Sequence, residues 1–213
     1  MGHKPPKISF EFFPPKSLQA SFDLWESLNV LAPLNPEFVS VTYGAGGTTR
    51  QLTKEMTEAI GKSYGLDVAA HLTCVNASKA ETLAIAKSYV DAGVKQIVAL
   101  RGDAPKGSAG FCPHPKGFAD SVDLVAGLAA TNIKTIHVGA YPEPHPEASN
   151  ANADIDWLKR KIDAGATSAI TQFFFDSEIF LRFRDGCVKA VIHVPIIPGI
   201  LPIENWDNVK RFA

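Results

Sequence analysis

The first apolar run of the chain, ISFEFF from Ile8, contains a single carboxylate, Glu11. Side chains alternate between the two faces of a β-strand, so Glu11 would point inward near the end of this one, which Pro14 and Pro15 terminate. A carboxyl group among aromatic rings loses hydration, which raises its pKa and makes it a candidate general acid near neutral pH. The alternative is an ion-paired structural carboxylate.

Charged residues also follow the fourth apolar run, which ends in Leu100, Arg101, Gly102 and Asp103. The glycine would let a flat ligand approach the backbone closely, with one charge on either side of it. In the alternative interpretation, Arg101 and Asp103 simply pair with each other. The residues alone leave both interpretations open.

The second and third runs add hydroxyl groups and an imidazole at their ends. Thr42 and Tyr43 close the second run, and His71 and Thr73 lie on one face of the third. A single histidine inside a barrel is more often a hydrogen-bonded core group than a ligand. The residues alone therefore favour a structural role for His71.

A stiff loop follows the fifth run. Its sequence, YPEPHPE from Tyr141, contains three prolines that hold an aromatic ring and the imidazole of His145 nearly fixed. A rigid loop loses less entropy when it binds a ligand. The predicted helix beyond it carries Asp154, Arg160 and Lys161, which face either phosphate groups or solvent.

The sixth run contains one polar residue, Gln172, followed by three phenylalanines. The rings are more consistent with packing than with cofactor stacking, whereas a buried amide needs a hydrogen-bond partner. The three cysteines, Cys74, Cys112 and Cys187, are scattered without the spacing of a disulfide framework or a metal site, which suits a reducing cytoplasm. Carboxylates, amide, imidazole and aromatic rings without a nucleophile or metal suggest that an organic cofactor performs the chemistry.

These residues need a parallel sheet to bring them together. Seven runs rich in β-branched and aromatic residues alternate with segments of helical spacing; the runs begin at Ile8, Phe38, Val68, Gln96, Thr135, Ala169 and Val194. Ser17, Ser78 and Asn205 are candidate helix N-caps, and Gly93 and Gly165 are candidate helix ends. The alternation predicts a parallel sheet covered by helices, either a closed barrel or an open doubly wound sheet.

The motifs favour the barrel. GAGGTTR at Gly44 does not complete a dinucleotide fingerprint, and GKS at Gly61 lacks the earlier glycine of a P-loop. Polar residues gather instead at the carboxyl ends of the strands, where (β/α)8 TIM barrels place their active sites. We therefore expect an α/β fold, a (β/α)8 TIM barrel truncated after about seven βα units.

Length and charge limit the number of domains and the kinds of partner. A chain of 213 residues predicts one unit, a single β/α-barrel catalytic domain over residues 1–213, with the eighth strand and helix missing and the chain therefore a fragment. The net charge is −1, so no global field favours nucleic acid or an anionic membrane. The polar amino terminus and the shortness of every apolar run argue against a signal peptide or a membrane span.

At this point the motifs closely resemble the methylenetetrahydrofolate reductase family. The matching strings follow the family's order across almost the whole chain: FEFFPPKS at Phe10, VSVTYGAGG at Val39, AHLTC at Ala70, LRGD at Leu100, YPEPHPEA at Tyr141, LKRKIDAGA at Leu158, AITQFFFD at Ala169 and IIPGILPI at Ile196. The resemblance implies a barrel that binds FAD, oxidises NADH or NADPH and reduces 5,10-methylenetetrahydrofolate to 5-methyltetrahydrofolate by ping-pong hydride transfer. It also implies a role in one-carbon metabolism and methionine biosynthesis, in a cytoplasmic homo-oligomer.

The resemblance assigns roles to individual residues. Glu11 matches the family's general acid, which helps to open the folate's bridging ring to an iminium ion. Asp103 matches a carboxylate near the flavin and the pterin, and Gln172 matches an amide that binds either the pterin or the nicotinamide. Phe212 matches an aromatic residue that packs against both substrates. The positions that the family uses for FAD are Thr42, His71, Leu100, Arg101, Gly102, Asp103, Ala119, Tyr141, His145, Asp154, Arg160 and Lys161.

Two other hypotheses have specific consequences. A folate-binding methyltransferase barrel would bind a similar pterin but transfer a methyl group to a corrinoid protein, and it does not explain the positions that match FAD contacts. An inactive barrel subunit would bind a full-length partner along its open edge, and the truncation is its only support.

Overall fold

A computed structural model of the protein describes residues 6–43, 50–104, 110–148, 150–203 and 206–210. Seven parallel strands pair in chain order, and at least one helix connects each strand to the next. The strands are β1 (Ser9–Phe12), β2 (Phe38–Val41), β3 (Val68–Thr73), β4 (Gln96–Leu100), β5 (Thr135–Ala140), β6 (Ser168–Thr171) and β7 (Ile196–Ile197). The helices are α1 (Leu18–Leu31), the 3-10 turn η1 (Ala32–Leu34), α2 (Arg50–Tyr64), α3 (Lys79–Asp91), α4 (Ser121–Ala129), α5 (Ala151–Asp163), α6 (Ser177–Lys189) and α7 (Trp206–Val209).

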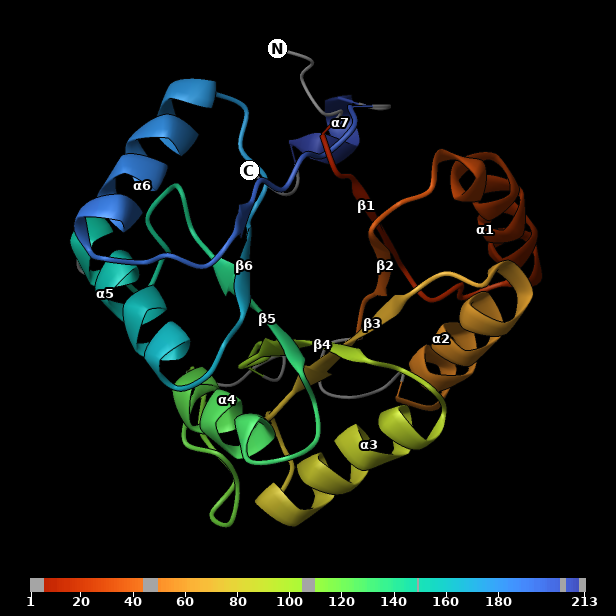
Figure 1. The fold of residues 1–213 in the computed structure, drawn as a ribbon, viewed down its shortest axis with the longest axis horizontal. Coiled ribbons are helices and arrows are strands. Elements are labelled where there is room, and N and C mark those ends of the chain that lie inside the picture. The colour runs from red at the N-terminus through yellow and green to blue at the C-terminus, as the bar shows by residue number, and fades with distance from the viewer. Residues whose placement is uncertain (1–5, 44–49, 105–109, 149, 204–205, 211–213) are drawn as a thin grey trace.

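The sheet curls into a partial barrel, with helices α1 to α6 on its outer side (Figure 1). This arrangement confirms the predicted α/β barrel class, and each of the seven predicted runs overlaps a strand. No β1–β7 ladder is present in the described residues, so β1 and β7 are the edges of this sheet. The predicted absence of an eighth strand and helix, and the assignment of residues 1–213 to a single domain, stay predictions.

Apolar side chains fill both sides of the sheet. The outer side packs against the helices through a large cluster that includes Leu72, Ile97 and Leu128, and a smaller cluster around Phe12. The inner side is lined by Phe38, Ala69 and Val98, with further partly buried side chains against them. Filling of both faces is the pattern expected for parallel strands.

Local signals fix several helix ends as predicted. The Ser17 hydroxyl accepts a hydrogen bond from the backbone of Ala20, and Ser78 forms a capping box with Glu81. Gly93 and Gly165 follow α3 and α5 with φ angles of 91° and 120°, which suit glycine. The predicted cap Asn205 lies outside the described residues.

In the described parts of the chain, no helix combines the length and the apolar character that crossing a membrane requires.

Candidate active site

A cavity of about 700 Å³ lies over the carboxyl ends of β3, β4 and β5, between the start of α4 and the inner side of α5. Many of the residues matched to FAD contacts line it, namely Leu100, Arg101, Gly102, Asp103, Ala119, Tyr141, His145, Asp154 and Lys161. Its volume falls within the range of small-molecule and cofactor sites. The carboxyl ends of the strands are also where barrel enzymes place their active sites.

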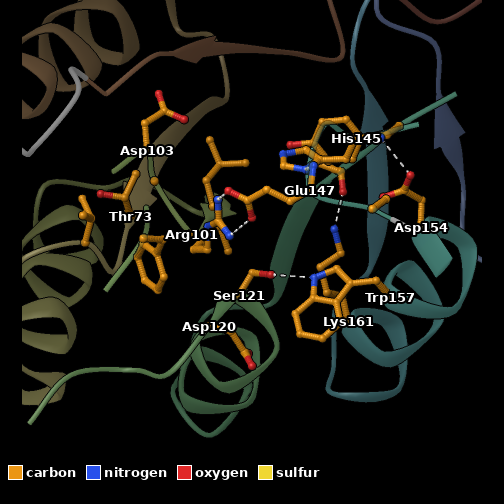
Figure 2. A pocket seen from close by; sticks show the side chains of 18 of the residues that line it. Thr73, Arg101, Asp103, Asp120, Ser121, His145, Glu147, Asp154, Trp157 and Lys161 are labelled. Carbon is orange, nitrogen blue, oxygen red and sulfur yellow. Dashed lines mark hydrogen bonds and ion pairs between the residues drawn. The ribbon is translucent and has the colours of Figure 1, made fainter. Parts of the chain in front are cut away.

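Arg101 forms the principal ion pair of this cavity. Its guanidinium donates two hydrogen bonds to the Glu147 carboxylate, at 2.6 and 3.0 Å (Figure 2). It also stacks on the Phe111 ring, 4.8 Å from the ring centroid. The pairing lowers the pKa of Glu147 and raises that of Arg101. Arg101 therefore pairs with Glu147 from the proline-rich loop, and Asp103 remains exposed beside the cavity.

Gly102 adopts a backbone conformation that other residues rarely take, with a φ angle of 87°. A side chain there would also collide with β3 and the residues after it, since an added Cβ would lie 2.9 Å from Val75 Cγ1 and 3.0 Å from Thr73 Cβ. The glycine therefore lets the chain after β4 pack closely against Thr73 and Val75, which line the cavity together with Gly102.

Lys161 reaches the cavity from α5. The side chain is buried, and its ammonium donates a hydrogen bond to the carbonyl oxygen of Gly139 in β5. Burial lowers the pKa of Lys161 to about 8, and the nearby Asp154 carboxylate partly opposes this shift. A buried cation at a cavity wall is suited to hold an anionic group such as a phosphate.

The loop after β5 is held in place by its own polar contacts. The His145 backbone N–H donates to Asp154 Oδ2 at 2.9 Å, and its ring nitrogen Nδ1 accepts from the Glu147 N–H at 3.1 Å. The Tyr141 and His145 rings meet edge to face, 4.7 Å between centroids. Burial raises the pKa of the Tyr141 hydroxyl, so this group stays protonated at neutral pH.

Several lining residues were not predicted from the sequence. Glu147 lies 46 positions from Arg101, and the indole of Trp157 donates to Ser121 Oγ at 3.3 Å across α4 and α5. Thr73 Oγ1 is buried and has no hydrogen-bond partner among the described residues. The proline-rich loop was predicted to lie at the site, and this was a sequence signal for Glu147. No sequence pattern near Trp157 or Ser121 indicated that these two side chains would meet.

A second polar group lies on the inner face of the sheet. Glu11 Oε2 is 3.2 Å from His71 Nε2, and it accepts a hydrogen bond from Ser40 Oγ at 3.3 Å. His71 is buried, whereas 48% of the Glu11 side chain is exposed. The inward direction predicted for Glu11 is therefore confirmed.

The predicted rise in the pKa of Glu11 is wrong. Burial raises this pKa, but the His71 imidazole and the Ser40 hydroxyl together lower it by more, so the net shift is downward. The aromatic neighbours that motivated the prediction lie elsewhere, since Phe12 faces the helices and Phe13 is exposed. Glu11 is an ionised partner of an imidazole.

The other residues predicted for the site lie away from the cavity lining or outside the described residues. Thr42 and His71 do not line the cavity in the described structure, and Arg160 is exposed and stacks on Trp157 at 4.4 Å. Gln172 lies one residue beyond β6 and is exposed, so its amide does not need the protein partner that a strand interior would require. Phe212 lies outside the described residues.

Solved structures with this fold include proteins of distant sequence. An uncharacterized protein from Clostridium thermocellum that binds two copies of 5-methyl-5,6,7,8-tetrahydrofolic acid matches with a TM-score of 0.66 and 14% identity, covering 97% of this chain and 69% of that one. The deoxyribose phosphate aldolase from Aeropyrum pernix matches with a TM-score of 0.57 and 15% identity, over 91% of this chain and 76% of that one. These similarities concern the fold alone.

Sequence comparison is more specific. The chain is 50% identical over 206 residues to the 5,10-methylenetetrahydrofolate reductases of Salmonella typhimurium and Escherichia coli, covering 97% of this chain and 68% of each relative. It is 36% identical to methylenetetrahydrofolate reductase (NADH) 1 of Arabidopsis thaliana, covering 97% of this chain and 37% of that protein. The sequence model of the family described as methylenetetrahydrofolate reductase matches residues 1–213. A match over the whole chain and this level of identity show that the chain belongs to the methylenetetrahydrofolate reductase family.

Proposed function

We propose that the protein reduces 5,10-methylenetetrahydrofolate to 5-methyltetrahydrofolate with NADH or NADPH, by ping-pong hydride transfer through bound FAD. One structural observation supports this proposal in addition to family membership. A cavity of about 700 Å³ with two cationic side chains, Arg101 and Lys161, lies over the strand ends of a sheet whose inner face presents the Glu11 carboxylate.

The residues present fit an FAD molecule. Lys161 provides a buried positive charge, and Thr73 Oγ1 is a buried polar atom without a partner among the described residues. Gly102 lets the backbone after β4 lie directly against Thr73 and Val75, and the three residues form part of the cavity lining. A dinucleotide offers phosphates, hydroxyls and flat rings, and these groups complement such a lining.

The proposed binding roles follow from these chemical properties. Arg101 and Lys161 would neutralise phosphate charge, and the edge-to-face pair of Tyr141 and His145 would form an aromatic wall. Bound FAD would supply the hydride transfer that no amino-acid side chain can perform. Among the other residues matched to FAD contacts, Asp154 would fix the loop that carries His145.

Two carboxylate side chains, Glu11 and Asp103, would act on the folate. Glu11 would deliver a proton to a nitrogen of the folate's bridging ring, which makes the attached carbon a better hydride acceptor. Asp103 is exposed at one side of the cavity, where its negative charge would stabilise a cation on the folate (Figure 2). Gln172 and Phe212 would contact the folate or the nicotinamide in turn.

The proposal also extends to the cellular setting, with a cytoplasmic homo-oligomer that serves methionine biosynthesis. The three cysteines are all free, which suits a reducing compartment. Exposed apolar side chains such as Phe13, Leu18 and Phe22 offer surface for a second subunit.

Addition of FAD to the purified protein tests the cofactor assignment. Bound oxidised flavin absorbs near about 450 nm and its emission changes on binding, so a saturable change with one FAD per chain is the expected result. A protein that neither carries flavin nor binds added FAD would contradict the proposal.

A further inference from the structure

The imidazole of His71 is buried against the proposed acid. Its Nε2 atom lies 3.2 Å from Glu11 Oε2, the same oxygen that accepts the hydrogen bond from Ser40. Glu11 is half exposed toward the inner side of the sheet, whereas His71 has almost no contact with solvent. The exposed member of this pair is therefore the one that a substrate can touch.

This arrangement makes it difficult for Glu11 to act as a general acid without a second proton-carrying group. A general acid must hold a proton before it can give one away. The contacts of Glu11 with His71 and Ser40 outweigh its burial and lower its pKa, so near neutral pH the carboxyl is ionised. A proton for the folate must come from a neighbouring group, and His71 is the titratable group in contact.

We infer that His71 is a positioning residue that stores the proton for catalysis and passes it through Glu11, which remains the group that touches the folate. The inference rests on the proposed function. The geometry permits such a transfer, because His71 Nε2 and Glu11 Oε2 lie 3.2 Å apart, a separation across which a proton can pass directly.

The transfer balances without any other reactant. The N–H bond at His71 Nε2 breaks as an O–H bond forms at Glu11 Oε2, which leaves a neutral imidazole and a neutral carboxyl. Glu11 then gives this proton to the folate nitrogen and returns to a carboxylate. A proton taken up from solvent at the exposed Glu11 carboxylate then passes back to His71 Nε2, which restores the imidazolium for the next turnover.

The other histidine of the sheet interior does not compete for this proton. His137 lies within hydrogen-bond distance of Ser168 Oγ, at 2.5 Å, and of Gln96 Oε1, at 2.8 Å, and its ring stacks on Phe38. Burial and the charge of His71 lower the pKa of His137 to about 4, so it is neutral near pH 7. Among the described residues, the titratable groups that face His71 here are Glu11 on β1, which contacts it, and His137 on β5, which is affected only by its charge.

The test is the pH dependence of the folate half-reaction. FAD-loaded protein is reduced under anaerobic conditions and mixed with methylenetetrahydrofolate, and flavin reoxidation is followed by stopped flow from about pH 5 to about pH 9. The proteins compared are the wild type, His71→Gln and, as a matched control, His137→Gln, which removes a buried imidazole that does not contact Glu11.

We expect His71→Gln to slow reoxidation at pH 7 by about tenfold or more, and to recover as the pH falls toward about 5, because a lone carboxyl is protonated only there. His137→Gln should keep the wild-type profile. A uniform loss for His71→Gln at every pH, with an unchanged profile, would show a merely structural role and overturn the inference.

A second measurement applies even if His71→Gln does not fold. Nitrogen-15 NMR of labelled histidine in the wild type should show His71 losing its proton over the same pH range in which reoxidation slows. Titration of His71 in a different range would overturn the inference while leaving the proposed function intact. A wild-type protein that methylenetetrahydrofolate cannot reoxidise would instead contradict the proposed function itself.

Discussion

Lys161 buries a positive charge at the wall of the cavity, and this gives cofactor binding a pH dependence. Its pKa is lowered to about 8, so the ammonium is charged below that pH and becomes neutral above it. We expect the affinity of the apoprotein for FAD to fall as the pH rises through about 8, because the phosphates lose a cationic partner. Flavin fluorescence titrations across this range measure the effect.

Replacement of Lys161 separates this charge from other effects of pH. Lys161→Met should weaken FAD binding at pH 7 by about ten- to hundredfold, the cost of one charge-assisted hydrogen bond, and should remove the pH dependence. Lys159→Met is the matched control, since Lys159 lies on the same helix but forms an ion pair with Asp163 at the surface. Equal losses in the two variants would argue against a phosphate-binding role for Lys161.

Glu11 should act in only one half-reaction. Glu11→Gln keeps the size of the side chain but cannot transfer a proton, so we expect reduction of the folate to fall by about 10²- to 10⁴-fold. Oxidation of NAD(P)H with an artificial acceptor should fall far less, because that step needs no proton from Glu11. Stopped-flow measurement of each half-reaction gives the ratio, and similar losses in both steps would remove Glu11 from the role of folate-specific acid.

The sequence identified the important residues better than their partners. The strand-end positions of Glu11 and Arg101 made both residues candidates for the site, and the structure places Arg101 at the cavity and Glu11 on the inner face of the sheet. Their partners, His71 and Glu147, lie 60 and 46 positions away, and only the curvature of the sheet and the path of the loop after β5 bring them close. The pKa of Glu11 depends on such a partner, which is why its direction could not be predicted from neighbouring residues.

Among the structural elements, the turn after β4 is the most sensitive to substitution. Gly102→Ala would place a Cβ 2.9 Å from Val75 at a φ angle of 87°, so we expect a loss of about 1–3 kcal/mol in the free energy of unfolding. FAD binding should weaken as well, because the same turn forms a wall of the cavity. Urea denaturation and flavin titration measure the two effects.

Gly61→Ala provides the comparison for this substitution. Gly61 lies inside α2, where an added Cβ would meet its nearest neighbours at an ordinary 3.8 Å. Alanine favours a helix over glycine by about 1 kcal/mol, so this variant should be as stable as the wild type or slightly more stable. A Gly102→Ala protein as stable as Gly61→Ala would show that the turn relaxes without cost.

Strand positions were predictable, but two strand lengths were not. The sixth run was expected to continue through Phe175, yet β6 ends at Thr171, and the rings of Phe173 and Phe175 pack on each other beyond it. In the seventh run, Pro195 and Pro198 flank Ile196 and Ile197 and lack the N–H groups that a ladder needs, so β7 has only two residues. Composition alone does not show where a chain leaves the sheet.

At the scale of the whole molecule, the curled sheet places two polar groups near the same ends of its strands. The cavity lies over β3 to β5, and the Glu11–His71 pair joins β1 to β3 on the inner face. The alternation of strands and helices made this arrangement predictable, because the carboxyl ends of parallel strands share one side of a barrel. The proposed reaction needs both groups, one to hold the cofactor and the other to protonate the folate.

The most direct test is a double-mixing experiment under anaerobic conditions. FAD-loaded protein is first mixed with NADH or NADPH and then with methylenetetrahydrofolate, while absorbance near about 450 nm reports the flavin. The proposal predicts bleaching in the first step, recovery in the second, and one 5-methyltetrahydrofolate formed for each flavin reoxidised. Bleaching without recovery, or recovery without methyltetrahydrofolate, would contradict it.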